Sequence, residues 1–206
     1  MNAIILCGGL STRLGDITKT IPKILLTVGD RTVLDWQLQK LKKLGISQVV
    51  LAAGHLADVL KRAVDGERQG VALTYAIEPE RLGTGGAIKY AWTQAPHPDR
   101  PTMVLNGDIL TTADFAAMKG MLRENVTGVL LGAKVSDSNG YGTLVFNEKN
   151  ELVAFREKEG RHDEGYINGG IYLFAPNAIG AFPSQSSFSI EYDVFPNLKG
   201  LVVYPT

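Results

Sequence analysis

Residues 2–23 read NAIILCGGLSTRLGDITKTIPK and join an apolar run to a loop whose basic residues include Arg13 and Lys23. The run NAIIL, closed by two glycines, is typical of a strand that is buried on both faces. The glycines would let the backbone approach a ligand closely, and Arg13 and Lys23 would meet phosphate oxygens. A surface loop with two solvated cations explains the same residues, so both interpretations stay open. The stretch contains neither a Gly-Lys-Ser/Thr phosphate loop nor a G-x-G-x-x-G dinucleotide motif.

Strand-like and helix-like segments alternate over the first half of the chain. The expected strands are residues 2–7, 46–53, 71–77 and 102–106, and the expected helices are residues 32–44, 55–64 and 85–95. This alternation predicts an α/β fold with a parallel sheet covered by helices on both faces. Beyond about residue 126, strand-like segments follow one another directly, so we expect the sheet to become mixed and to carry a hairpin or small extension. No linker interrupts the pattern, and residues 1–206 are interpreted as one domain.

The composition narrows the class of protein. Lys plus Arg and Asp plus Glu both number 21, so there is no net charge and nucleic acid is not an expected partner. The single cysteine, Cys7, excludes an internal disulfide framework. There is no apolar run of the ~20 residues that a membrane span needs, and no secretion signal. We expect a cytoplasmic protein with no membrane partner. An exposed helix face or a hairpin at 140–165 could form a homodimer.

Three strand ends combine glycine with polar residues: CGGLSTR (7–13), EPERLGTGGA (78–87) and NGD (106–108). In open α/β sheets, ligands bind beyond the carboxyl ends of the strands, so all three could face one crevice. Asp108 is placed to hold Mg²⁺ beside a phosphate, although an ordinary Asn-Gly-Asp turn explains it as well. The glycines at 83–86 suit either a helix start that faces a ligand or a simple turn. Residues 157–158 suit either a ligand contact or a solvated charge pair.

The motifs are more specific together than singly. The stretch GGLSTRLGDITKTIPKILLTV resembles the signature of sugar-1-phosphate nucleotidylyltransferases, and LGTGGA, LNGD, YGTL, FREK and INGGIYLF follow in that family's order. The likeness covers essentially the whole chain and is greatest to the short bacterial D-glycero-D-manno-heptose 1-phosphate guanylyltransferases. It implies a three-layer α/β/α, Rossmann-like nucleotide-diphospho-sugar transferase fold, with a mixed, mostly parallel sheet and a small β-hairpin extension.

The resemblance also implies a reaction in which an NTP and a sugar 1-phosphate give an NDP-sugar and pyrophosphate, with Mg²⁺ as cofactor. GTP and D-glycero-D-manno-heptose 1-phosphate are the first choice of substrates, and the product would be a precursor of lipopolysaccharide or capsule. Uridylyl or thymidylyl transfer to a mannose, glucose or N-acetylmuramic acid type of 1-phosphate is the alternative reaction. A non-catalytic subunit that senses nucleotide sugars is the alternative from another class of protein.

Residue roles follow from the matching motif positions. The resemblance implies that Arg13, Lys23 and Asp108 are catalytic and that Asp108 holds Mg²⁺. The implied nucleotide contacts are Leu6, Gly8, Gly9, Arg13, Gly83, Thr84, Gly85 and Asn106. The implied sugar-phosphate contacts are Gly142, Glu157, Lys158 and Asn168.

The chain departs from the family pattern at two places. Ser11 stands where the family usually has glycine, which adds a side chain to the phosphate loop. The family also carries a second metal-binding Asp in a D-x-G motif, after a strand that resembles GLVVYP, and the sequence stops at Thr206, before that motif. We therefore expect the family's C-terminal segment to be missing from these residues. Glu191 and Asp193 match a different family segment and are not assigned as replacements.

Overall fold

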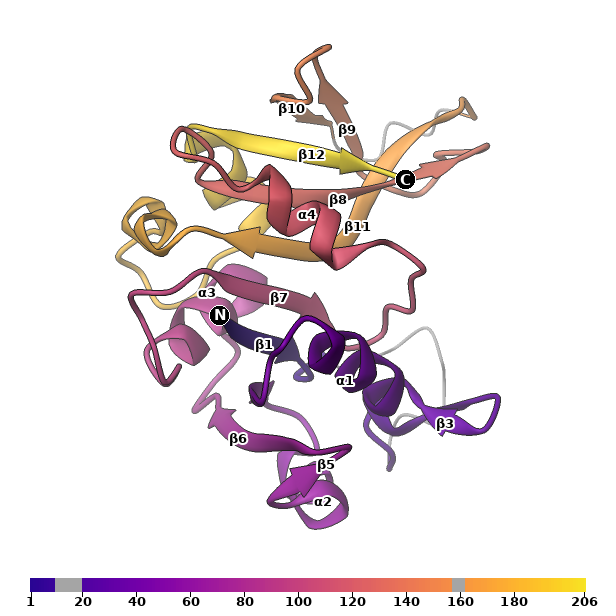
Figure 1. The fold of residues 1–206 in the computed structure, drawn as a ribbon, viewed down its shortest axis with the longest axis vertical. Coiled ribbons are helices and arrows are strands. Elements are labelled where there is room, and N and C mark those ends of the chain that lie inside the picture. Colours follow the sequence, from indigo (N-terminus) through magenta and orange to yellow (C-terminus); the bar gives the residue numbers. More distant parts are fainter. Residues whose placement is uncertain (10–19, 157–161) are drawn as a thin grey trace.

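The computed structural model describes residues 1–9, 20–156 and 162–206. Ten strands of these residues form one sheet that runs the length of the molecule (Figure 1). They are β1 (Asn2–Leu6), β4 (Gln48–Ala53), β5 (Glu67–Arg68), β6 (Val71–Ile77), β7 (Thr102–Asn106), β8 (Gly128–Val135), β9 (Thr143–Phe146), β10 (Leu152–Arg156), β11 (Gly165–Phe174) and β12 (Leu201–Pro205). Their order is β10-β9-β11-β7-β1-β4-β6-β5, and β8 joins the sheet through β11 and carries β12. A separate hairpin pairs β2 (Thr27–Val28) with β3 (Arg31–Thr32).

The helices lie in the connections between these strands. They are α1 (Val33–Lys43), α2 (Ala57–Val64), α3 (Gly83–Trp92) and α4 (Phe115–Met121). Shorter helical turns are η2 (Lys23–Leu25), η3 (Pro176–Ala181), the π-helical η4 (Ile190–Val194) and η5 (Phe195–Asn197). In the described residues, no helix combines the length and apolar character needed to cross a membrane.

One half of the sheet is parallel. Strand β1 lies between β4 and β7, and β4 pairs in turn with β6, all in the same direction. Helical crossovers return the chain each time to the same starting edge, as parallel pairing requires. The carboxyl ends of these four strands therefore meet at one edge of the sheet.

The other half is mixed, as the sequence predicted. Strand β11 runs antiparallel to β7, β8 and β9, and β9 forms an antiparallel hairpin with β10. This hairpin stands at one end of the molecule in Figure 1. The register of β11 against β8 shifts between Asn168 and Tyr172, where Gly170 adopts a positive φ of 67°. This irregularity re-aims the side chain of Asn168 at the edge where the parallel strands end.

The sheet is covered on both faces, which gives three layers. Alternate residues of β1 face opposite sides, so Ala3 and Ile5 pack in one core and Ile4 in the other. Apolar residues of α1, α2 and α4 fill the first core, and α1 and α4 lie on the viewer's side in Figure 1. Apolar residues of α3 and the helical turns after β11 fill the second core. The α/β fold predicted from the sequence is confirmed.

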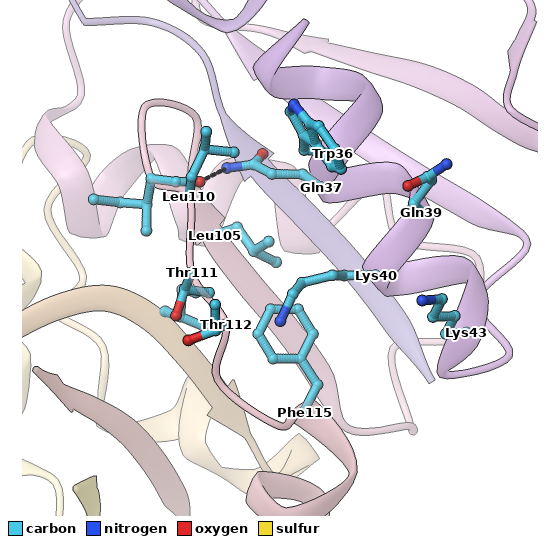
Figure 2. Close-up of a pocket in the computed structure, with 12 residues that line it drawn as sticks. Trp36, Gln37, Gln39, Lys40, Lys43, Leu105, Leu110, Thr111, Thr112 and Phe115 are labelled. Atoms are coloured by element: carbon cyan, nitrogen blue, oxygen red, sulfur yellow. Dashed lines mark hydrogen bonds between the residues drawn. The ribbon is translucent and has the colours of Figure 1, made fainter. Parts of the chain in front are cut away.

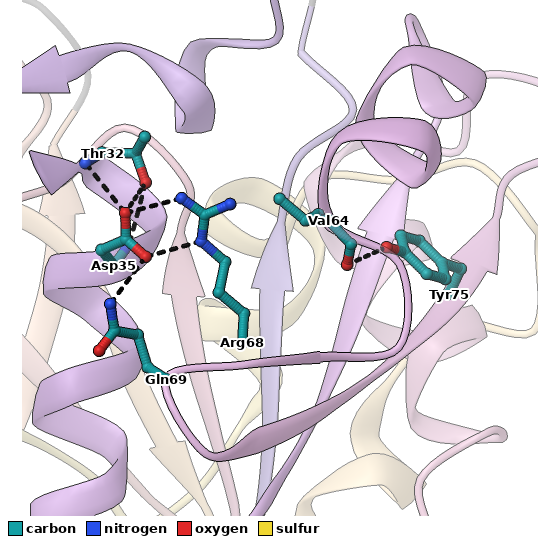
Figure 3. Close-up of polar contacts among 6 residues, drawn as sticks. All are labelled: Thr32, Asp35, Val64, Arg68, Gln69 and Tyr75. Carbon is teal, nitrogen blue, oxygen red and sulfur yellow. Dashed lines mark hydrogen bonds and ion pairs between the residues drawn. The ribbon is translucent and has the colours of Figure 1, made fainter.

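Asp35 ties the start of α1 to the turn between β5 and β6 (Figure 3). Its carboxylate accepts hydrogen bonds from the backbone and side chain of Thr32 and from Arg68 and Gln69. The Asp35 N–H donates in return to the Thr32 hydroxyl oxygen, which completes a capping box. The Arg68 guanidinium holds the pKa of the Asp35 carboxyl well below its usual range, against the opposing effect of burial. A nearby hydrogen bond from the Tyr75 hydroxyl to the carbonyl of Val64 secures the end of α2.

Helix α4 was not predicted from the sequence pattern. It has seven residues, and only Phe115 and Met118 are buried, so it offers too few turns for a helical period to stand out. Asp114 accepts hydrogen bonds from the backbone N–H groups of Ala116 and Ala117 and begins the helix. The packing of these two apolar side chains on the sheet, rather than a long periodic pattern, accounts for α4.

Candidate active site

The loops that follow β1 and β7 touch each other at the carboxyl edge of the sheet. The N–H of Gly107 donates to the carbonyl of Leu6 over 2.9 Å. A Cβ at position 107 would lie 2.5 Å from that oxygen, so no larger residue fits there without a shift. This contact brings Asp108 beside the segment Cys7–Gly9, as the prediction of a shared crevice requires.

A cavity of about 210 Å³ lies at this point. It is lined by Leu6, Cys7, Gly9, Lys23, Ile24, Thr84, Asn106, Gly107 and Asp108. Six of these nine residues were predicted to contact nucleotide or to act in catalysis. Gly8 lies beside the cavity, between Glu78 and Gly54. The predicted Arg13 lies outside the described residues.

Lys23 and Asp108 form an ion pair in this cavity. The Nζ atom of Lys23 lies 3.0 Å from Oδ2 of Asp108, and their side chains are 26% and 48% exposed. Lys23 begins the turn η2, which the buried Ile24 anchors in the core. Both charged ends therefore remain accessible to a ligand, while their backbones are held in place.

Gln37 fixes the backbone on both sides of Asp108 through hydrogen bonds. Its buried side-chain amide donates to the carbonyl of Asn106 and to that of Ile109, each over 2.8 Å, and Figure 2 draws the second of these hydrogen bonds. Gln37 also lines a larger cavity, of about 550 Å³, which lies between α1, the segment after β7, and α4. None of the site residues predicted from the sequence is among the residues that line this larger cavity.

The glycines at the start of α3 serve packing. The N–H groups of Gly85 and Gly86 donate to the carbonyl of Phe188, at 3.0 and 3.3 Å. A Cβ at Gly83 would lie 2.6 Å from the same oxygen. Because Gly85 is buried and its N–H is engaged within the protein, Thr84 is the residue of this segment that lines the predicted nucleotide cavity, which is the one that contains Lys23 and Asp108. The nucleotide contacts of Gly83 and Gly85 stay predictions.

Glu78 is a site residue that the sequence analysis overlooked. It follows β6 directly, and its carboxylate faces Gly8, where a Cβ would lie 2.8 Å from Glu78 Oε1. The other oxygen accepts from the N–H of Leu82 over 3.3 Å. Burial raises the pKa of the Glu78 carboxyl. An acidic residue at the end of the third parallel strand was the available signal. The family motif in this segment begins at Leu82 and therefore does not include Glu78.

A second cavity, of about 270 Å³, brings together part of the predicted sugar site. It is lined by Tyr141, Gly142, Phe155, Ile167, Asn168, Glu191 and Tyr192. Gly142 is required here because any Cβ would overlap the ring of Phe155. Glu157 and Lys158 lie outside the described residues, just after β10. The two cavities adjoin, because Glu191 of the second is hydrogen-bonded to Thr84 of the first.

The donor atoms around Asp108 fit a magnesium ion that is shared with phosphate. In the residues that the structure describes, no three His, Cys, Asp or Glu side chains gather to hold a metal by themselves. Mg²⁺ is usually held by one or two carboxylates together with substrate phosphates and water. Asp108 offers one accessible carboxylate, and Lys23 engages only its Oδ2 atom.

The comparisons identify the family. Residues 2–198 match the model of the nucleotidyl transferase family, and the chain belongs to that family. The chain is 38% identical to D-glycero-alpha-D-manno-heptose 1-phosphate guanylyltransferase of Campylobacter jejuni, covering 98% of this chain and 88% of that protein. The enzyme of the same name from Aneurinibacillus thermoaerophilus is 35% identical, over 94% of this chain and 83% of its own.

A solved structure agrees with this assignment. The crystal structure of HddC from Yersinia pseudotuberculosis complexed with GMP-PN superposes with a TM-score of 0.83 at 29% identity, covering 100% of this chain and 90% of that one. The resemblance to sugar-1-phosphate nucleotidylyltransferases, and to their heptose 1-phosphate guanylyltransferases, is confirmed. Nucleotidyl transfer to a sugar 1-phosphate is accordingly the activity of this class.

Proposed function

We propose that this chain transfers the guanylyl group of GTP to D-glycero-α-D-manno-heptose 1-phosphate. A phosphate oxygen of the sugar 1-phosphate attacks the α-phosphorus of GTP, the bond from that phosphorus to the β-phosphate oxygen breaks, and pyrophosphate leaves. The proposal rests on one observation, which is that two cavities adjoin at the carboxyl edge of the sheet. One contains Lys23 and Asp108, and the other contains Asn168. The names of the two heptose-specific relatives support the choice of substrates.

The residues of the chain would align two polyanions and offset their charge. Lys23 would exchange its contact with Asp108 for oxygens of the α-phosphate, and Asp108 would hold Mg²⁺. When bound, Mg²⁺ would supply positive charge to the phosphates during the transfer. Arg13 would meet the departing β- and γ-phosphates, and Lys158 the sugar phosphate, as the family pattern implies. Because the reaction consumes a nucleoside triphosphate, we propose that it takes place in the cytoplasm.

Glu78 supports guanine as the base. A carboxylate only accepts hydrogen bonds, and the Watson–Crick edge of guanine offers two adjacent donors, N1–H and the 2-amino group. Uracil and thymine offer one N–H between two carbonyl oxygens, which a carboxylate would repel. Glu78 lies beside the Gly8 backbone, where a base would enter between the ends of β1 and β6. We therefore favour GTP over UTP or dTTP.

The test measures pyrophosphate release with Mg²⁺, a panel of NTPs, and the 1-phosphates of heptose, mannose and glucose. We expect turnover with GTP and heptose 1-phosphate to exceed every other pair. Glu78→Gln should lower kcat/KM for GTP by about 10- to 100-fold, since each lost base contact discriminates by about 1–3 kcal/mol. The matched control is Glu148→Gln, on the exposed turn between β9 and β10, which lines neither cavity.

Two other outcomes would contradict the proposal. Preferred turnover with UTP or dTTP would replace the guanylyl assignment by the uridylyl or thymidylyl alternative. Binding of a nucleotide sugar without pyrophosphate release from any pair would favour the sensing subunit. The accessible Lys23–Asp108 pair argues for catalysis, because a sensor has no need of a cation and a metal ligand at the reacting phosphate.

A further inference from the structure

Glu191 has a central position between the two cavities, for which neither the family motifs nor the proposed reaction assigns a role. It is the second residue of the π-helical turn η4, 107 residues after Thr84 and 23 after Asn168. The hydroxyl of Thr84 donates to its Oε2 atom over 3.1 Å, and the amide of Asn168 donates to Oε1 over 3.4 Å. The hydroxyl of Ser189 donates to Oε2 over 2.7 Å. One carboxylate thus joins the nucleotide cavity to the predicted sugar cavity.

The direction of these hydrogen bonds is fixed by neighbouring groups. The hydroxyl oxygen of Thr84 accepts from the N–H of Ile190 over 3.0 Å, which turns the Thr84 proton toward Glu191. The Asn168 amide nitrogen donates to the Tyr172 hydroxyl over 2.9 Å as well as to Glu191. The Asn168 oxygen accepts from the N–H of Gly170 over 3.0 Å. Both protons of the Asn168 amide are therefore engaged within the protein.

These contacts change what the cavity offers to a sugar. An ionised carboxylate has about four acceptor positions, and Glu191 receives its two short hydrogen bonds on Oε2 alone. Within the described residues, Oε1 receives one long hydrogen bond, from Asn168, and Glu191 is one of the residues that line the cavity. Sugar hydroxyl groups are hydrogen-bond donors, so Oε1 is the strongest acceptor that the described lining presents to them.

Part of the cavity lining is aromatic. The rings of Phe155 and Tyr192 lie 6.1 Å apart in an edge-to-face arrangement, and both line the cavity with Glu191. A sugar ring has apolar C–H faces and a polar rim of hydroxyl groups. A cavity lined by apolar rings and a few placed polar groups fits such a ligand.

We propose that Glu191 is a specificity-determining residue that accepts hydrogen bonds from hydroxyl groups of the sugar, with Asn168 and Thr84 as positioning residues for its carboxylate. The inference rests on the proposed function for the identity of the sugar phosphate. Because Glu191 is negatively charged, it faces the hydroxyl-bearing part of the sugar and not the 1-phosphate. It also selects against sugars with a carboxylate at the contacted position, through like-charge repulsion.

The test compares Glu191→Gln with wild-type protein and with the control Glu148→Gln. A hydrogen bond to a charged group that is lost from a closed site corresponds to a change of about 10- to 100-fold. We expect KM for heptose 1-phosphate to rise by that factor and KM for GTP to change by less than about threefold. Thr84→Val removes one donor to Glu191 and should raise the sugar KM by a smaller factor. Thermal melting checks that each variant folds.

A second readout separates recognition of hydroxyl groups from a structural role. Deoxy analogues of the sugar 1-phosphate should lose efficiency with the wild-type enzyme, and for the analogue that lacks the contacted hydroxyl this loss should vanish in Glu191→Gln. Unchanged sugar KM and unchanged discrimination in a folded variant would refute the role of Glu191 while leaving the proposed function intact. If the wild-type protein shows no turnover, calorimetric titration with heptose 1-phosphate compares the affinity of the wild type for this ligand with that of Glu191→Gln. Absence of both turnover and binding in the wild type would overturn both proposals.

Discussion

The Nζ atom of Lys23 lies 3.0 Å from Oδ2 of Asp108, although 85 residues separate them in the sequence. One residue enters the site from the loop that leaves β1 and the other from the end of β7. Their opposite charges offset each other at the cavity that both residues line. In the proposed reaction a triphosphate would replace Asp108 as the partner of Lys23, and the carboxylate would then hold the metal ion.

Replacement of Lys23 should affect activity much more than stability. We expect Lys23→Ala to lower kcat by about 10²–10³-fold, the usual effect of removing one group that stabilises transition-state charge. The free energy of unfolding should change by at most about 1 kcal/mol, because exposed ion pairs contribute little. Pyrophosphate release and urea denaturation would measure the two effects. Lys61→Ala, an exposed cation on α2, is the control. Near-normal turnover of Lys23→Ala would refute its catalytic role.

Replacement of Asp108 tests the proposed magnesium ligand. Asp108→Asn keeps the shape of the side chain but removes the charge that a divalent ion requires. We expect activity to fall by at least about 10²-fold and the remaining activity to need more Mg²⁺ for half-saturation. The measurement is pyrophosphate release over a Mg²⁺ titration, with the exposed Asp99→Asn as control. An unchanged Mg²⁺ requirement would assign the metal to other groups.

The raised pKa of Glu78 predicts a pH dependence of GTP binding. Only the ionised carboxylate accepts hydrogen bonds from both donors of guanine. Protonation of Glu78 should therefore weaken the binding of GTP and affect the binding of the sugar phosphate less. Because burial raises the pKa of Glu78, KM for GTP should begin to rise at a higher pH than for an ordinary glutamate. Steady-state kinetics over mildly acidic pH would show this rise in the wild type and its absence in Glu78→Gln. The same profile in both proteins would exclude Glu78 as its origin.

The Asp35 carboxylate should make the free energy of unfolding depend on pH in the acidic range. The folded-state pKa of Asp35 lies well below the unfolded value of about 3.9, so its stabilisation is fully present above the unfolded pKa and is lost as pH falls toward the folded one. We expect Asp35→Asn to lower the free energy of unfolding by about 2–3 kcal/mol near pH 7, since Arg68 loses its partner. The difference from wild type should shrink below about pH 4.

Urea denaturation at several pH values would measure this effect. Asp58→Asn is the matched control, because Asp58 also lies in the first turn of a helix but is exposed. A loss of stability that is the same at every pH would show that packing of the side chain, and not its charge, is what matters at position 35.

Cys7 should react slowly despite its place at the nucleotide cavity. Burial, and then the negative charge of Glu78, raise the pKa of the Cys7 thiol, and the thiolate is the reactive form. We expect alkylation by iodoacetamide at neutral pH to be at least about tenfold slower in the folded protein than in urea. Glu78→Gln should speed the reaction of the folded protein. Equal rates in the two folded proteins would show that the two side chains do not interact.

Local patterns explain how much of this molecule was predictable. The buried strand β1 and helix α1 follow from apolar periodicity, and the glycine that ends α1 has the positive φ of 80° that such an end favours. The family signature added the order of the motifs, and with it Lys23, Asp108 and Asn168. Each of these signals comes from residues that are close together in the chain, so it can be recognised from the sequence alone.

The contacts that complete the site depend on the pairing of distant strands. Glu78 meets Gly8 because β4 lies between β1 and β6 in parallel register, and Glu191 meets Thr84 because the turn after β11 returns to the start of α3. Neither contact has a local signature, since a lone glutamate after a strand or in a short helical turn is common. The sequence alone determines the main strands and helices, the order of the motifs and the class of chemistry. The tertiary structure alone decides which acidic groups share a cavity, because strand register and layer packing set distances between residues that are far apart in the chain.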